Sequence, residues 1–245
     1  MLNLPLLLCG HRGVASLAPE NTLAGLKAAH DLGLSWVEID VQLTKDLQPV
    51  LLHDATVNRC SNGRGQLRDY DYQQLSELDA GSWFDSRFAS EKIPLLADYL
   101  AQAARFNIQV NIELKVHRGD NETILCERVA KVIEKACQPS TLLFSSFSET
   151  CVANMQSLLP KIARGILFEK LPAHWQAQAQ RLNAISIHCH HRHLTPLQAL
   201  QIKAAGYQLY CYTVNKPKRA AQLASWGVDM IFTDKPQNIK TSGQL

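Results

Sequence analysis

The sequence predicts an α/β protein in which eight strand–helix units close into a (β/α)8 barrel, with a small inserted lobe after the second strand region. Short apolar runs alternate with helical periodicity along most of the chain, and this alternation is typical of parallel sheets. The length of 245 residues suits one barrel, so we treat residues 1–245 as a single domain. The main alternative is an open doubly wound sheet, because the pattern alone does not show closure.

The predicted strands are short runs rich in Leu, Ile and Val. They cover residues 6–9, 36–41, 108–115, 142–144, 162–168, 185–188, 207–214 and 230–232. Helices are expected between these strands, with Pro, Ser or Thr near several starts and glycine at several ends. They cover residues 19–33, 96–105, 122–136, 149–159, 175–181, 195–206 and 217–227.

The second strand is followed by a returning arm instead of a helix. Turn chemistry at residues 44–49 leads to an extended segment at residues 50–53. If the two arms form an antiparallel hairpin, Asp40 lies opposite His53. Periodicity then fades at about residues 55–90, where Asn, Gly, Ser and Asp are frequent, and we predict that this insert is not part of the barrel.

The central stretch is Trp36 to Val41, an apolar run that Glu38 and Asp40 interrupt. Alternate residues of a strand share one face, so both carboxylates point the same way. Two buried anions require a cation, either a basic residue or a metal ion. Glu113 ends the next barrel strand. Three carboxylates without a sulfur ligand favour a hard divalent cation, Mg²⁺ or Ca²⁺, over zinc.

Other polar residues also stand at predicted strand ends. His11 and Arg12 follow the first strand, His53 ends the returning arm, and Lys115 follows Glu113. Strand ends meet at one mouth of a barrel. Arg12 and Lys115 would neutralise an anionic group there, and the two histidines would divide the proton transfers. These residue types indicate metal-assisted hydrolysis of a phosphodiester.

Five ordered motifs resemble the glycerophosphodiester phosphodiesterase family, most of all its soluble bacterial cytoplasmic type. They are His11-Arg12-Gly13, Pro19-Glu20-Asn21-Thr22, Glu38-Ile39-Asp40, His53-Asp54 and Glu113-Leu114-Lys115. The resemblance implies a TIM barrel that hydrolyses glycerophosphodiesters to sn-glycerol 3-phosphate and an alcohol. Such an enzyme would feed glycerol 3-phosphate from lipid breakdown into metabolism.

The resemblance also implies roles for single residues. It implies three metal ligands and one acid/base pair, namely Glu38, Asp40, Glu113, His11 and His53. Arg12 would contact the phosphate, and Glu20 would line or brace the site. From the predicted strand faces we add Lys115 as a second phosphate contact and His188 as part of the pocket wall. Which histidine is the acid, and whether water or the glycerol 2-hydroxyl attacks, stays open.

Two functional alternatives are kept. One is a phospholipase of the same barrel type that acts on intact lipid, and the other is a non-catalytic barrel that binds a phosphate ligand. The net charge of +3 does not favour nucleic acid or an anionic membrane. No apolar run is long enough to cross a bilayer, so we expect no stable membrane association. A homodimer is left open.

Several smaller features also carry expectations. The seven cysteines are scattered without a Cys-x-x-Cys pair, which fits free thiols and a cytoplasmic location. The opening segment lacks a basic start and a cleavage site, so we do not interpret it as a leader. The histidine-rich residues 187–193 suggest a second metal site or ordinary packing. Trp83 and Phe84 would cap the substrate or pack the insert onto the barrel, and Asn215 would reach the mouth or cap a helix.

Overall fold

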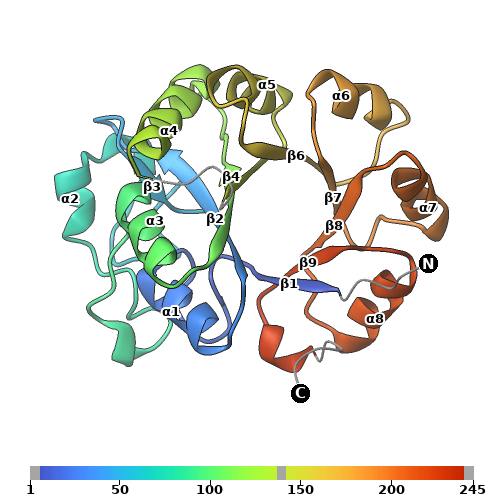
Figure 1. Ribbon diagram of the computed structural model, residues 1–245. Helices are drawn as coiled ribbons and strands as arrows, with labels where there is room; N and C mark the ends of the chain where they lie inside the picture. Colours follow the sequence, from blue (N-terminus) through green and yellow to red (C-terminus); the bar gives the residue numbers. More distant parts are fainter. Residues whose placement is uncertain (1–5, 137–141, 240–245) are drawn as a thin grey trace.

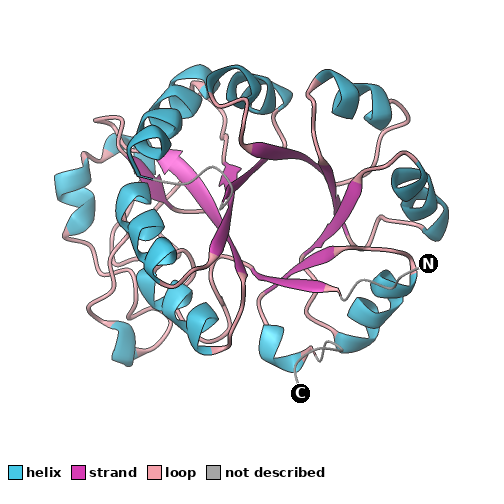
Figure 2. Ribbon diagram, in the orientation of Figure 1, coloured by secondary structure: helices cyan, strands magenta, loops and turns pink. Residues whose placement is uncertain are grey.

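The computed structural model describes residues 6–136 and 142–239 and shows a closed barrel surrounded by helices (Figures 1 and 2). Neighbouring strands pair in the order β1-β9-β8-β7-β6-β5-β4-β2, and a β1–β2 pairing closes the ring. All these pairings are parallel. The predicted barrel is confirmed, and the open sheet is excluded. The strands are β1 (Leu7–Gly10), β2 (Trp36–Leu43), β3 (Pro49–Leu51), β4 (Gln109–Leu114), β5 (Leu142–Ser146), β6 (Ala163–Phe168), β7 (Ser186–His190), β8 (Gln208–Tyr212) and β9 (Met230–Thr233).

Helices lie outside the ring of strands, as the sequence predicts (Figure 1). They are α1 (Leu23–Asp31), α3 (Leu96–Arg105), α4 (Glu122–Ala136), α5 (Glu149–Leu158), α6 (Trp175–Arg181), α7 (Pro196–Ala204) and α8 (Pro217–Ser225). Local sequence explains their starts: the Thr22 side chain accepts a hydrogen bond from Gly25 N, and Thr195 and Gln198 form a capping box at α7. None of the helices in the described ranges is long and apolar enough to cross a membrane.

Apolar side chains fill two separate layers. The larger layer lies between the strands and the helices. A smaller cluster includes Cys9, Leu143, Tyr210, Met230 and Phe232, from strands on different sides of the ring. Because packed side chains close the interior, a ligand has room only at the ends of the barrel, and chemistry in this fold uses the end where the strands finish.

The hairpin formed by β2 and β3 differs from the predicted register by one residue. Val41 pairs with Leu51, and Leu52 N donates to Asp40 O at 3.1 Å. Asp40 therefore lies opposite Leu52, and the predicted pairing with His53 is wrong. The turn at residues 44–48 has an odd number of residues, which moves its centre by half a residue. Since the ladder of β3 ends at Leu51, His53 lies outside it.

The segment between β3 and α3 has short elements and a small core of its own. The elements are η1 (Leu67–Asp69), α2 (Tyr72–Ser76) and η2 (Ser86–Phe88). The core includes Val57, Leu67 and Leu75 together with Val50 of β3. Figure 1 shows α2 beyond the ring of barrel helices, on the side of β3. The insert is thus packed against the returning arm, next to the end of β2.

Trp83 of the insert and the cysteines are further residues for which the sequence makes predictions. Trp83 Nε1 donates to Ala80 O at 2.8 Å and its ring meets Phe84 edge-on, and both of these contacts lie within the insert. The described cysteines are free and buried, namely Cys9, Cys60, Cys126, Cys151, Cys189 and Cys211. Cys137 and the opening residues 1–5, which also carried expectations, lie outside the described residues.

Candidate active site

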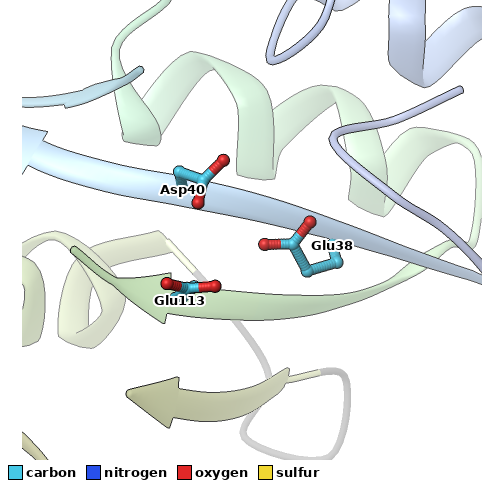
Figure 3. Close-up of side chains that lie close together, drawn as sticks. All are labelled: Glu38, Asp40 and Glu113. Atoms are coloured by element: carbon cyan, nitrogen blue, oxygen red, sulfur yellow. The ribbon is translucent and has the colours of Figure 1, made fainter. Parts of the chain in front are cut away.

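Three carboxylates meet at the mouth of the barrel (Figure 3). Glu38 and Asp40 come from β2, and Glu113 comes from β4, where it pairs in register with Asp40. One oxygen of each carboxylate lies within 4.8 Å of the others. Asp40 is only 1% exposed and Glu38 only 4%. The predicted shared face therefore exists, and it concentrates negative charge in a place with little water.

Asp40 is surrounded by donors. Its carboxylate accepts from Asn21 Nδ2 at 2.9 Å and forms ion pairs with Arg12 Nε at 3.3 Å and Lys115 Nζ at 3.1 Å. Burial alone would raise the pKa of Asp40, but Lys115 and Arg12 outweigh it and lower that pKa far below its ordinary value. Asp40 is thus fixed in its charged form.

Glu38 and Glu113 have the opposite electrostatic setting. Burial and the charge of Asp40 raise the pKa of Glu38 to about 8, and the same two causes raise the pKa of Glu113. Lys115 Nζ donates to Glu113 Oε1 at 2.6 Å, and Glu38 Oε2 accepts from Arg12 N at 3.0 Å. Glu38 Oε1 is buried and has no hydrogen-bond partner among the described residues. An oxygen in this state fits a metal ligand.

His11 is held by a chain of polar side chains. Its Nδ1 lies 2.6 Å from Asp234 Oδ1, and Asn215 Nδ2 donates to Asp234 Oδ2 at 2.6 Å. The other ring nitrogen, Nε2, lies 3.9 Å from Glu38 Oε2. Burial lowers the pKa of His11, but Asp234 and Glu38 outweigh burial, and the net pKa is raised. Asp234 therefore orients the ring so that Nε2 faces the carboxylate cluster.

His53, which follows β3 on the returning arm, is also held by a carboxylate. Its Nδ1 lies 2.7 Å from Asp54 Oδ1, and Arg59 Nε donates to Asp54 Oδ2 at 2.7 Å. The side chain of His53 is 30% exposed. Its pKa is lowered, mainly by burial, although Asp40 acts in the other direction. Each of the two histidines thus has a carboxylate on Nδ1.

Glu20 joins the barrel to the insert. It accepts from Arg12 Nη1 at 2.7 Å and from Arg59 Nη1 at 2.6 Å. Burial would raise the pKa of Glu20, but Arg59 and Arg12 outweigh it and lower that pKa. Arg12 has a φ of 53°, a left-handed conformation that costs a non-glycine residue energy and is typical of functional sites. The position fits the predicted bracing role of Glu20.

His188 is the one predicted site residue that does not lie at the mouth. It is fully buried on β7, where its Nε2 lies 2.9 Å from Ser186 Oγ. The rings of Tyr210 and Phe232 pack against it, with centroids at 4.9 and 5.4 Å. Burial lowers its pKa to about 3. The expectation that His188 lines the pocket is wrong, because its side chain faces the filled interior of the barrel.

The histidine-rich stretch offers no second metal site. Within residues 6–136 and 142–239, only Glu38, Asp40 and Glu113 form a group with the spacing of metal ligands. The rings of His190 and His193 pack together with centroids 5.1 Å apart. Ordinary packing among surface and core histidines therefore describes this stretch better than a metal site.

Some residues of the site were not assigned from the sequence. Asp234 directly follows β9. The pattern that points to His11, a polar residue directly after a buried strand, points equally to Asp234. Asn215 was expected to reach the mouth or cap a helix; it binds Asp234, and Lys216 occupies the N-cap position of α8. Arg59 lies in the insert, where no periodicity locates it. Asn21 belongs to one of the five motifs, but the sequence alone indicates no role for its side chain.

A barrel whose mouth combines three carboxylates with the spacing of metal ligands, two cationic side chains and two imidazoles suits an enzyme that cleaves a phosphate ester. The fold and the groups at its mouth together are typical of barrel phosphodiesterases. The model of the glycerophosphoryl diester phosphodiesterase family matches residues 11–238, and the chain belongs to this family. It is therefore a phosphodiesterase, and the non-catalytic alternative is not retained.

Individual relatives agree with this assignment. A glycerophosphodiester phosphodiesterase of Caldanaerobacter subterraneus subsp. tengcongensis is 32% identical over 238 residues, which cover 95% of this chain and 96% of that protein. A phosphodiesterase of Oleispira antarctica, solved in complex with the product sn-glycerol-3-phosphate, has a TM-score of 0.93 and 35% identity, with 96% and 95% of the two chains covered. A glycerophosphodiester phosphodiesterase of Agrobacterium tumefaciens has a TM-score of 0.80 and 27% identity, with 95% and 98% covered.

Proposed function

We propose that this enzyme hydrolyses glycerophosphodiesters to sn-glycerol 3-phosphate and an alcohol, and that it requires a divalent cation, Mg²⁺ or Ca²⁺. The main support is the carboxylate cluster, in which Glu38 Oε1 is buried without a partner among the described residues. The Oleispira phosphodiesterase is solved in complex with its product sn-glycerol-3-phosphate, and this supports the same product here.

The proposed ligands of the cation are Glu38, Asp40 and Glu113. All three offer oxygen, which suits Mg²⁺ and Ca²⁺. The raised pKa values of Glu38 and Glu113 reflect burial and repulsion by Asp40, and a bound cation would offset both effects by stabilising the charged carboxylates. When bound, the ion would supply positive charge against the phosphoryl oxygens.

The cationic side chains would position the phosphate. Arg12 and Lys115 flank the two oxygens of Asp40, at 3.3 and 3.1 Å, so both lie at the edge of the cluster. Arg12 is further fixed by Glu20, and its planar guanidinium is suited to two oxygens of one phosphate. These contacts would orient the diester before any bond breaks.

The two histidines would carry the protons. One would accept a proton from the attacking hydroxyl, and the other would donate one to the leaving oxygen. Asp234 and Asp54 each lie on the Nδ1 side of their histidine, at 2.6 and 2.7 Å. This leaves Nε2 of each ring for the substrate, which is the arrangement that general acid–base catalysis needs.

The proposal is tested by turnover of glycerophosphocholine with the purified protein. We expect release of glycerol 3-phosphate, loss of that activity in EDTA, and its return when Mg²⁺ or Ca²⁺ is added in excess of the chelator. Full activity in EDTA would show that the carboxylate cluster does not act through a metal. Absence of turnover with metal present would contradict the substrate class.

A further inference from the structure

We propose that a cavity beside the carboxylate cluster binds the alcohol part of the substrate and selects alcohols that carry negative charge. The inference rests on the proposed function, because it concerns the half of the diester that the reaction releases. The cavity has a volume of about 530 Å³. Small-molecule sites typically have volumes of roughly 300–1,000 Å³.

The cavity lies next to the catalytic groups. Lys115 lines it, and its Nζ lies 2.6 Å from Glu113 and 3.1 Å from Asp40. His117 also lines it, and its Nε2 contacts the carbonyl oxygen of His53 at 3.1 Å. A phosphate held beside Lys115 would therefore have one of its two ester substituents directed toward this space.

The lining of the cavity carries a net positive charge among neutral and apolar side chains. Four basic side chains and one carboxylate contribute to it, namely Lys45, Arg68, Lys115, Arg118 and Asp120. Arg68 is partly neutralised by Asp120, at 3.6 Å, and Lys115 is paired with the carboxylate cluster. Neither Lys45 nor Arg118 forms an ion pair with any other described residue. These two cations are the ones available to a ligand.

The charge and size of the cavity favour the alcohol over the glycerol unit. The glycerol unit is uncharged and is common to all glycerophosphodiesters, so it needs no group of cations. It would also leave most of this volume unfilled. An alcohol that carries a phosphate or carboxylate would be attracted by Lys45 and Arg118, whereas a trimethylammonium group would meet like charge.

The first test compares two substrates in the presence of metal: glycerophosphoinositol 4-phosphate, which has an anionic alcohol, and glycerophosphocholine. We expect wild-type kcat/KM to favour the anionic diester. In the double variant Lys45→Gln, Arg118→Gln, this preference should fall by about tenfold, as expected for two partly exposed cations. The matched control Lys161→Gln, Lys218→Gln removes the same charge from exposed sites away from the cavity and should keep the wild-type ratio.

An unchanged ratio in the double variant, or a wild-type preference for glycerophosphocholine, would overturn the inference. A second measurement does not depend on turnover: calorimetric binding of glycerophosphoinositol 4-phosphate in EDTA. We expect binding about tenfold weaker in the double variant than in the control variant. Equal affinities would overturn the inference, whereas a clear difference without any turnover would count against the proposed function alone.

Discussion

At the residue scale, the site is defined by three carboxylates with different electrostatic states. Asp40 stays charged because Lys115 and Arg12 lower its pKa, whereas burial and Asp40 raise the pKa of Glu38 to about 8. Within the described chain, the unpartnered oxygen of Glu38 has no protein donor to satisfy it. Even with Arg12 and Lys115 beside it, the cluster is an unfavourable arrangement for three charged carboxylates without a further cation, which is consistent with a functional role.

The first residue-scale prediction concerns Asp234. Asp234→Asn keeps the shape of the side chain but removes the charge that raises the pKa of His11. We expect kcat to fall by roughly 10–100-fold, less than the roughly 10²–10⁴-fold expected for His11→Ala or His53→Ala. The limb of the pH profile that reports His11 should also move to lower pH, because the acceptor that stabilises its protonated form is weaker.

The control for this prediction is Asp31→Asn, an exposed aspartate that pairs with Lys27 on α1. It should leave both kcat and the pH profile unchanged. A wild-type pH profile in Asp234→Asn would show that Asp234 does not act through His11.

Much of the site follows from one sequence rule, that polar residues at the ends of buried strands are exceptional. This rule singles out His11, Arg12, Glu38, Asp40 and Glu113, which the structure brings close together. The prediction for His188 came from strand alternation. Alternation shows which face of the sheet a side chain is on, but not how deep in the barrel it lies. The rule for strand ends could not find Arg59, whose contact with Glu20 spans 39 positions of sequence through an aperiodic insert.

At the element scale, Arg59 is one of the side chains that tie the insert to the barrel, and Arg68, which pairs with Asp120, is another. Arg59 binds Glu20 after β1 and Asp54 after β3, and these carboxylates in turn contact Arg12 and His53. The insert therefore supports two residues of the site without touching the carboxylate cluster itself. Its small apolar core keeps Arg59 in place on the rim.

We predict that Arg59→Gln destabilises the protein in a pH-dependent manner. Arg59 lowers the folded-state pKa values of Glu20 and Asp54 from ordinary values of 4.5 and 3.8. Lowered carboxylate pKa values stabilise the fold above the ordinary values, and this stabilisation is lost as pH falls through the folded-state values. Because Arg59 is 44% exposed, we expect a loss of only about 1 kcal/mol at neutral pH.

Urea unfolding at several pH values checks this prediction. The difference from wild type should be largest near neutral pH and should shrink as the pH is lowered below the ordinary carboxylate values. Arg87→Gln is the matched control, since Arg87 lies in the same insert, is 76% exposed and pairs only locally with Asp85. A difference that is independent of pH would contradict the account of Arg59.

Most helices and strands were predictable because the sequence signals that define them lie within each element or directly beside it. Helix starts carry their capping residues, as at Thr22 and Thr195, and buried parallel strands are continuous apolar runs. The register of the β2–β3 hairpin was not predictable to one residue, because it depends on the geometry of the turn at residues 44–48. The same limit applies to any pairing inferred from turn composition alone.

At the scale of the whole molecule, closure of the barrel explains why distant residues meet. His11 and Asp234 are separated by 223 positions, yet β1 and β9 are neighbours in the ring. Glu38 and Glu113 meet because β2 and β4 are neighbours, with the returning arm and the insert placed outside the barrel. The sequence could predict alternating units, but only their closure brings the two histidines and the three acids to one mouth.

Calorimetric titration of Mg²⁺ and Ca²⁺ into metal-free wild-type protein and into Glu113→Gln tests directly whether the three carboxylates bind a divalent cation. We expect saturable binding of one of these ions at one site in wild type, and affinity at least about tenfold weaker in Glu113→Gln. The control Glu127→Gln, an exposed glutamate on α4, should bind as wild type does. Absence of saturable binding by either ion, or equal affinity in Glu113→Gln, would contradict the account.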